Sequence, residues 1–282
     1  MGQHEKDVAR GGRFEFGKNW LHFLRHLDKH RINRAEESLL AMLELPDLVG
    51  KTFLDIGSGS GLFSLAARRL GAKVHSFDYD PQSVTCTRCL KDAYFPNDPD
   101  WMIEEGSVLD EGYVRSLGQF DVVYSWGVLH HTGDMWRALG HAVLPSKFGG
   151  KVFIAIYNDQ GRWSRRWLQI KRLYNHLPAS MKLPYAVLLM GTREFPQIVK
   201  DLVRLTPTRY IRRWTNYADT CTRGMSYWHD LIDWVGGYPF QVAKPEQVFE
   251  FYKQHSFRLD KIKTCAGDIG CNEYVLTRIR QS

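Results

Sequence analysis

Three glycines and two acids are the residues of this chain best suited to binding a nucleoside. Asp55, Gly57, Gly59 and Gly61 lie within residues 55–61, and Asp78 follows at the end of the next apolar run. Glycines let the backbone turn tightly and let a ligand approach a helix N-terminus, while an acid at the next strand end accepts hydrogen bonds from ribose hydroxyls. The spacing therefore predicts a site for a ligand that contains a nucleoside.

A strand, a glycine turn, a helix and a second strand must position these residues. Residues 52–56 form a short apolar run with one acid, which is typical of a buried strand. Apolar residues then recur at helical spacing up to Gly71, and residues 73–77 form the next apolar run. This order and length predict a parallel βαβ crossover.

The glycine spacing distinguishes two kinds of nucleoside site. The dinucleotide fingerprint GxGxxG needs a glycine where this chain has Leu62. With its acid and three glycines in the form (E/D)xGxGxG, the sequence instead resembles the class I S-adenosylmethionine-dependent methyltransferases, and its overall form is similar to the quinone-ring O-methyltransferases. The resemblance implies S-adenosylmethionine as the cofactor, held at the ends of the first four strands. The expected cofactor-binding residues are Asp55, Gly57, Ser58, Gly59, Gly61, Asp78, Tyr79, Val108, Leu109, Asp110, Ser125 and Trp126.

The remaining patterns complete the fold that this family implies. Further strands are predicted at residues 101–105, 120–125, 151–157, 258–264 and 272–279, with helices at 81–94 and 244–255. The predicted fold is α/β, with a doubly wound, seven-stranded, mostly parallel sheet whose last strand is antiparallel. Residues 1–12 are expected to be disordered and residues 13–45 helical. Phe14, Phe16 and Trp20 are candidates for a lid over the cofactor, with ordinary packing as the alternative.

Three parts are expected along the chain. Residues 1–50 form an N-terminal helical lid, residues 51–157 and 241–282 form the methyltransferase core, and residues 158–240 form a large helical insertion after the fifth strand. The insertion holds thirteen Lys and Arg against six Asp and Glu, which accounts for the whole net charge of +7. Basic and aromatic residues together suit a phosphorylated metabolite, a lipid-linked substrate or RNA. We therefore expect a basic, aromatic-rich substrate cap, the alternative being a solvated basic face around a small aromatic core.

Catalytic candidates follow from the chemistry of methyl transfer. The donor is already activated, so the protein mainly aligns the two partners and excludes water, and a general base is needed only for an acceptor that carries a proton. Imidazole titrates near neutrality and suits this task. The candidates are His130 and His131 after the fourth strand, Tyr157 at the end of the fifth, and His229 late in the insertion; the alternative for the paired histidines is capping of the following turn. Cys86 and Cys89 are spaced as CxxC, but no metal is expected, because no second pair of Cys or His lies at a zinc-site spacing.

These patterns predict a methyltransferase that acts on oxygen or nitrogen of a small acceptor, anionic, phosphorylated or lipid-linked. Two alternatives stay open. The first is an RNA methyltransferase, which the positive charge suggests. It is not favoured, because the sequence shows no RNA-binding module and no base-methylation motif such as NPPY after the fourth strand. The second alternative is a regulatory protein that binds the cofactor without catalysis.

Composition bears on where the protein acts. No run reaches the roughly eighteen apolar residues of a membrane-spanning helix, and the polar N-terminus carries no secretory signal. Five cysteines are too few and too scattered for a disulfide framework. A cytoplasmic protein without an integral membrane segment is expected, and the sequence predicts no particular oligomer.

Overall fold

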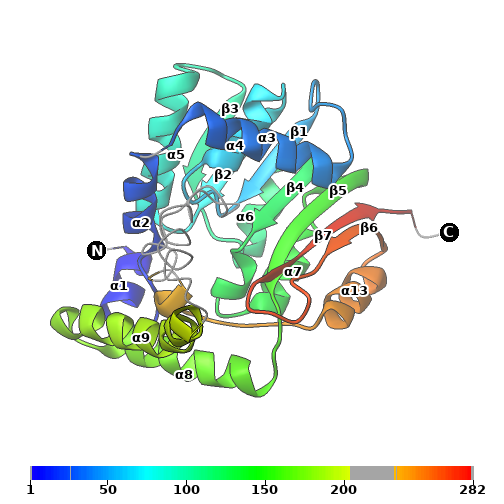
Figure 1. The fold of residues 1–282 in the computed structure, drawn as a ribbon. Helices are drawn as coiled ribbons and strands as arrows, with labels where there is room; N and C mark the ends of the chain where they lie inside the picture. The colour runs from blue at the N-terminus through cyan, green and yellow to red at the C-terminus, as the bar shows by residue number, and fades with distance from the viewer. Residues whose placement is uncertain (1, 26, 204–231, 233, 281–282) are drawn as a thin grey trace. The chain divides into compact units, whose positions relative to one another are not determined.

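The computed structural model describes residues 2–25, 27–203, 232 and 234–280 (Figure 1). The chain divides into two compact units, which we describe separately. The core unit comprises Glu15–Arg165 and Pro239–Ser282, and the helical unit comprises Met1–Phe14 and Arg166–Tyr238. Within the described ranges, no helix is both long enough and apolar enough to span a bilayer.

A seven-stranded sheet organises the core unit, in the order β3-β2-β1-β4-β5-β7-β6. All neighbouring strands pair in parallel except β7, which is antiparallel to both β5 and β6. The predicted doubly wound sheet with an antiparallel last strand is therefore confirmed. The strands are β1 (Thr52–Ile56), β2 (Lys73–Asp78), β3 (Trp101–Glu105), β4 (Phe120–Trp126), β5 (Ser146–Tyr157), β6 (Phe257–Lys263) and β7 (Cys271–Arg278).

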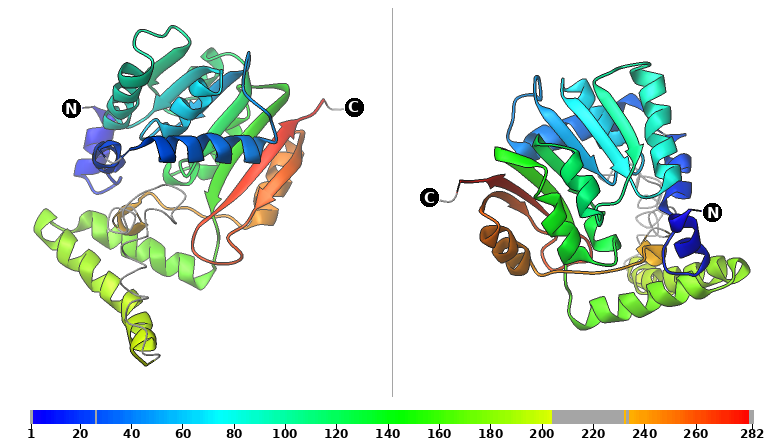
Figure 2. Two further views of the ribbon diagram at one scale, coloured as in Figure 1. Left: turned by 45° about the horizontal axis from the view of Figure 1, so that its top comes forward. Right: turned by 180° about the vertical axis from the view of Figure 1, so that it is seen from behind.

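Helices cover both faces of this sheet (Figure 2). Side chains alternate along a strand, so successive residues within β1, and within β4, point to opposite faces of the sheet. On one face the ring of Tyr124 lies 5.7 Å from Phe53 and 5.1 Å from Phe63 of the first helix after the glycine turn. The helices of the core unit are α2 (Phe16–Leu24), α3 (Lys29–Leu43), α4 (Leu62–Arg69), α5 (Pro81–Tyr94), α6 (Glu111–Ser116), α7 (Met135–Ala142) and α13 (Pro245–Gln254).

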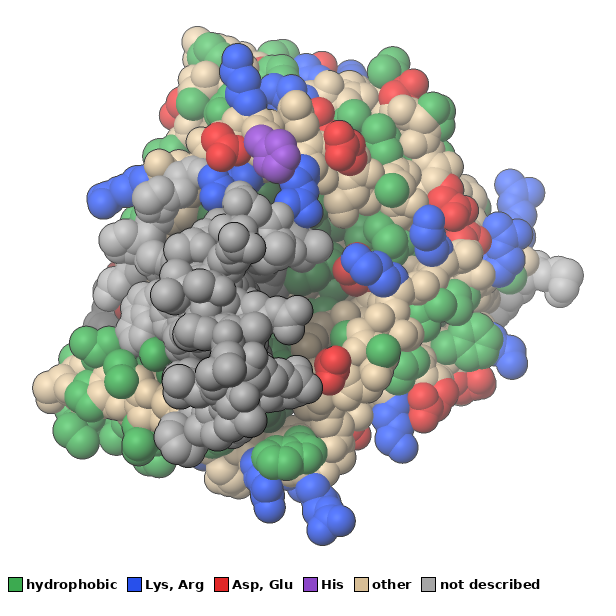
Figure 3. Space-filling model, viewed as in Figure 1, with side chains coloured by type: hydrophobic (Ala, Val, Ile, Leu, Met, Phe, Trp, Pro, Cys, Tyr) green, Lys and Arg blue, Asp and Glu red, His purple; other side chains and the backbone are tan. Residues whose placement is uncertain are grey.

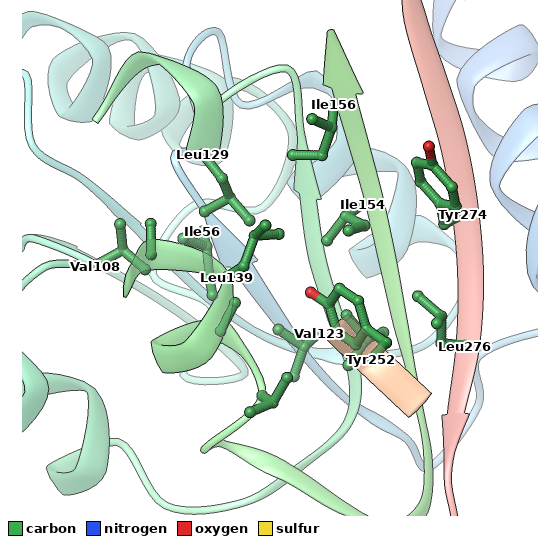
Figure 4. Packing of buried hydrophobic residues seen from close by; sticks show 14 of the residues in the cluster. Ile56, Val108, Val123, Leu129, Leu139, Ile154, Ile156, Tyr252, Tyr274 and Leu276 are labelled. Carbon is green, nitrogen blue, oxygen red and sulfur yellow. The ribbon is translucent and has the colours of Figure 1, made fainter. Parts of the chain in front are cut away.

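The opposite face holds the larger apolar cluster (Figure 4). Leu54, Val123 and Ile154 project from neighbouring strands towards Leu139 of α7 and Tyr252 of α13, and all five side chains are buried. Because β1, β4 and the second half of β5 are covered on both faces, their sequences are mostly apolar. This packing fixes the ends of the parallel strands, where the candidate site residues lie.

Two sequence predictions are corrected by the structure. Residues 3–9 form helix α1 (Gln3–Ala9) rather than a disordered tail, and its His4 is buried in the helical unit. Strand β5 begins at Ser146 rather than at residue 151, because Ser146 pairs with Phe120 of β4 ahead of a register shift. Both signals were missed because they depend on distant partners rather than on local periodicity.

The helical unit is built from α1, most of α8 (Arg162–His176) and α9 (Ala179–Val203). Its interior is polar as well as aromatic: the buried Lys171 donates from Nζ to the Trp234 carbonyl, and Asn175 Nδ2 donates to the Gly236 carbonyl over 2.7 Å. The insertion after β5 is thus helical in its described part, as predicted. The basic and aromatic residues that the insertion carries at 209–214 lie outside the described residues.

Candidate active site

The glycine turn between β1 and α4 has a backbone that other residues would not adopt. Gly57, Gly59 and Gly61 have φ values of +78°, +55° and +81°. A Cβ on Gly57 would lie 2.4 Å from Cγ1 of Val128, and a Cβ on Gly61 would lie 2.8 Å from Cα of Thr87. The turn therefore needs glycine for both conformation and space, because Val128 and Thr87 fill the Cβ positions of Gly57 and Gly61.

Asp78 at the end of β2 faces this turn. Its Oδ2 accepts a hydrogen bond from the Gly59 amide over 2.9 Å, and its Oδ1 accepts from the Asp80 amide over 2.9 Å. These two bonds fix the orientation of the carboxylate beside the glycines. The structure thus brings together two predicted parts of the nucleoside site, with Tyr79 as the next residue along.

Asp55 lies in a buried polar network beneath the turn. Ser64 Oγ donates to its Oδ2 over 2.5 Å, Ser64 and Ser76 share a bond of 2.7 Å, and Trp101 Nε1 donates to Ser76 Oγ over 3.0 Å. Burial raises the pKa of Asp55 to about 7, against the lowering effect of the Ser64 hydrogen bond. In this arrangement Asp55 ties α4 to β1, and direct contact with a cofactor stays a prediction.

The other predicted cofactor residues lie at the carboxyl ends of the strands, the edge at which open parallel sheets bind ligands. Ser125 is buried and donates from Oγ to the Ile56 carbonyl over 2.9 Å, with Trp126 next to it. Asp110 is exposed and accepts the Tyr113 amide over 3.0 Å, which caps α6. The remaining three are Ser58, whose Oγ lies 2.9 Å from Thr87 Oγ1, the buried Val108 and the half-buried Leu109. Their contact with a cofactor also stays a prediction.

Three of the four catalytic candidates meet beyond β4 and β5. The short 3-10 turn Leu129–His131 carries both histidines, and the ring of His130 lies 3.9 Å from that of Tyr157 and 4.4 Å from that of His131. All three side chains are buried. His229 lies outside the described residues.

The hydrogen bonds of the two histidines indicate their tautomers. His131 Nδ1 lies 2.6 Å from the carbonyl oxygen of Pro239, which can only accept, so Nδ1 carries the proton and the basic lone pair of the neutral ring is on Nε2. His130 Nδ1 accepts the Tyr157 amide over 3.4 Å, which places its ring proton on Nε2. In His131 the lone pair is on Nε2, the ring nitrogen that does not contact Pro239. In His130 the lone pair is on Nδ1 and already accepts the Tyr157 amide.

Helix α2 connects the two parts of the site. The Phe16 ring lies 5.0 Å from His131, and a Cβ on Gly59 would lie 3.1 Å from Trp20 Nε1. The Gly17 amide donates to Asp80 Oδ2 over 2.8 Å, which anchors α2 on the N-terminus of α5. Two of the three predicted lid residues thus lie beside the site, whereas Phe14 packs in the helical unit against Tyr174.

Sequence reasoning missed Pro239, whose carbonyl orients His131. The two residues are 108 positions apart, so no local pattern relates them.

Among the described residues, no three His, Cys, Asp or Glu side chains are grouped so that they could hold a metal ion.

Comparison with known proteins gives three findings. A family model described as a methyltransferase domain matches residues 27–185. Ubiquinone biosynthesis O-methyltransferases of Escherichia coli O157:H7 (strain EC4115 / EHEC) and Paramagnetospirillum magneticum are 31% and 32% identical over 138 and 146 residues, 47% and 52% of this chain. The matches span 53% and 51% of those proteins, so the chain matches about half the length of these curated relatives. A solved Methanococcus maripaludis structure, described as an S-adenosylmethionine-dependent methyltransferase, has a similar fold, with a TM-score of 0.51 and 15% identity over 94% of this chain and 93% of that one.

Proposed function

Because the chain belongs to the methyltransferase domain family, we propose that it transfers the methyl group of S-adenosylmethionine to an oxygen of a small acceptor molecule. The family match confirms the methyltransferase class that the sequence predicts, and it supports S-adenosylmethionine as the cofactor. The choice of oxygen is supported by the ubiquinone biosynthesis O-methyltransferases among the relatives.

The glycine turn and Asp78 fit the cofactor. The amides of Gly57 and Gly59 are bonded to the Phe77 carbonyl and to Asp78, and Val128 fills the Cβ position of Gly57, so the turn is held in one conformation beside Asp78 at the start of α4. Asp78, held by the Gly59 amide, is the residue that would accept the ribose hydroxyls. When bound, S-adenosylmethionine supplies a methyl group already activated by a positively charged sulfur. The chain's own task is to hold the acceptor oxygen in line and to remove its proton.

The hydrogen bond between His131 Nδ1 and the Pro239 carbonyl is the observation that carries the proposed proton transfer. It leaves the lone pair of the neutral ring on Nε2, which would accept the proton of the acceptor hydroxyl. The positive charge that develops on the ring is stabilised by the Pro239 carbonyl oxygen, which accepts the same hydrogen bond. The adjacent Tyr157 and His130 rings are buried and restrict the orientation of His131.

Two exposed faces of the helical unit support an anionic, lipid-linked acceptor. On α9 the large apolar residues exposed in the first turns are Met181, Leu183, Val187 and Leu188, with 52%, 57%, 46% and 65% of their areas accessible. Met181 and Leu188 are seven residues apart and Leu183 and Val187 are four apart, so the four side chains lie on one half of the helix surface. On α8 the exposed side chains include Arg166 and Arg172. A unit that exposes both an apolar helix face and cations suits an amphiphile with a negatively charged head group.

RNA is the second candidate acceptor because of the net positive charge of the insertion. On the face shown in Figure 3, Lys and Arg side chains of the described part are interspersed with Asp and Glu. On this face the mixing interrupts the continuous basic surface that a long polyanion would bind.

Methyl labelling of a cell extract tests the proposal. Transfer of labelled methyl from S-adenosylmethionine, followed by partition into aqueous molecules, lipid extract and RNA, should place the label in the lipid extract. Label released only by nuclease would identify RNA instead. The double substitution Leu183→Ser and Leu188→Ser should reduce lipid labelling, whereas Ile262→Ser, at an exposed position of β6, should not.

Two further measurements separate binding from catalysis. S-adenosylhomocysteine at 100 times its Kd should stabilise the protein by about 2.7 kcal/mol; stabilisation by NAD alone would contradict the cofactor assignment. His131→Gln should keep this stabilisation and lower kcat by roughly 10²-fold or more, the usual contribution of a general base. His255→Gln, at an exposed position after α13, is the matched control and should retain full activity.

A further inference from the structure

One short segment of the core unit is bonded to all three described catalytic candidates. We call Pro239–Ala243 the strap. The Pro239 carbonyl accepts from His131 Nδ1 over 2.6 Å, the Gln241 amide donates to the His130 carbonyl over 3.0 Å, and the Ala243 amide donates to the Tyr157 carbonyl over 3.0 Å. Every second residue of the strap thus forms a hydrogen bond with a different residue of the candidate site.

The strap is itself held by side chains. Gln241 Oε1 accepts the amide of Met135, the first residue of α7, over 2.9 Å. The Phe240 ring is buried and lies 5.4 Å from that of Tyr157. Gln241 is therefore bonded through its backbone to the turn that carries the histidines and through its side chain to the helix that follows this turn.

We propose that the strap positions His131 for proton transfer and that Gln241 is its positioning residue. This inference rests on the proposed function of His131. A backbone carbonyl cannot donate, so contact with Pro239 keeps the imidazole proton on Nδ1 and the basic lone pair on Nε2. If the strap moved away, the neutral ring would distribute its proton over both nitrogens, and a fraction of the molecules would present an N–H to the acceptor hydroxyl.

The proton balance is complete in this arrangement. The acceptor hydroxyl loses its proton to Nε2, the ring becomes a cation with both nitrogens protonated, and Nδ1–H stays bonded to Pro239. The ring then returns the Nε2 proton to water and regains the starting tautomer. Gln241 touches no reacting atom, so its removal should affect the orientation of the base rather than the binding of S-adenosylmethionine.

Three substitutions of Gln241 test this role in the full-length protein. Gln241→Ala removes the side chain, Gln241→Met keeps its length but lacks the oxygen, and Gln241→Glu keeps an oxygen that can accept the Met135 amide. Nitrogen-15 NMR of the histidine rings, without any acceptor present, reports which nitrogen carries the proton. We expect His131 to be protonated on Nδ1 in the wild type and in Gln241→Glu, and to show both tautomers in Gln241→Ala and Gln241→Met.

Kinetics provide the second readout. Loss of part of a general-base effect of about 10²-fold or more should lower kcat by roughly tenfold in Gln241→Ala and Gln241→Met, with the KM for S-adenosylmethionine unchanged and activity retained in Gln241→Glu. Gln254→Ala, at an exposed position of α13, is the matched control and should behave as wild type in both assays. If Gln241→Ala fails to fold, the longer methionine side chain gives the same comparison.

The outcomes separate this inference from the proposed function. A folded Gln241→Met variant with an unchanged His131 tautomer overturns the role of Gln241, whatever the activity. An altered tautomer with unchanged kcat overturns the link between the strap and catalysis. A wild-type protein with the expected tautomer but no methyl transfer to any fraction contradicts the proposed function, while the NMR result still supports the geometry of the strap.

Discussion

Replacement of Asp55 by asparagine should change how the stability of this protein depends on pH. Asp55 is fully buried, its ordinary pKa of 3.8 is raised to about 7 by burial, and the Ser64 hydrogen bond only partly offsets this effect. In the native state the carboxyl holds its proton up to about pH 7, whereas in the unfolded chain it releases the proton near pH 4. The native state therefore binds one more proton over this interval, and stability falls as the pH rises.

The magnitude follows from the width of that interval. One extra native-state proton changes the free energy of unfolding by about 1.4 kcal/mol per pH unit, so about three pH units amount to roughly 4 kcal/mol. The asparagine side chain cannot ionise, so the variant does not lose this stability as the pH rises. The stability of Asp55→Asn relative to wild type should therefore rise steadily from about pH 4 to about pH 7 and then level off. A constant cost of pairing the new amide group shifts the whole curve without altering its slope.

Urea denaturation at several pH values measures this difference directly. Asp98→Asn is the matched control, because Arg68 donates to Asp98 Oδ2 over 2.6 Å and lowers the pKa of that carboxyl. For Asp98 the pH dependence of stability has the opposite sign. The stability that the ionised Asp98 contributes is present above about pH 4 and is lost as the pH falls through its native pKa. A flat difference between Asp55→Asn and wild type from pH 4 to pH 7 would show that Asp55 is ionised in the native state and refute the reasoning.

Three further substitutions test the site and the core. Asp78→Ala should abolish the thermal stabilisation by S-adenosylhomocysteine while the unliganded protein still unfolds cooperatively; a retained thermal shift would remove Asp78 from the ribose site. Gly57→Ala should destabilise the protein by more than about 1 kcal/mol in denaturant, because of its φ of +78° and the contact with Val128, and additional Val128→Ala should restore part of the loss. Tyr252→Phe should leave stability unchanged or raise it by about 1–3 kcal/mol, because the buried Tyr252 hydroxyl has no hydrogen-bond partner in the described part of the chain; a clear drop in the denaturation midpoint would reveal a partner.

The glycine turn and the strands around it could be read from the sequence because their requirements are local. Gly57, Gly59 and Gly61 need left-handed backbone, and β1 and α5 begin and end at the residues that the apolar runs predicted. Periodicity is a property of neighbouring residues, so it survives without knowledge of the fold. The resemblance to the methyltransferase family rests on these signals, and that resemblance implied the cofactor and the sheet with its antiparallel last strand.

The tertiary structure decided which functional groups meet and in what chemical state. Asp55 was predicted from its motif, but its buried bond to Ser64 and its raised pKa depend on how α4 packs on the sheet. The tautomer of His131 depends on a carbonyl 108 residues away, and α1 forms a helix within the helical unit although its own sequence is polar. A sequence pattern specifies conformation over a few residues, whereas dielectric environment, tautomer and the partners of a strap arise only when distant segments are packed together.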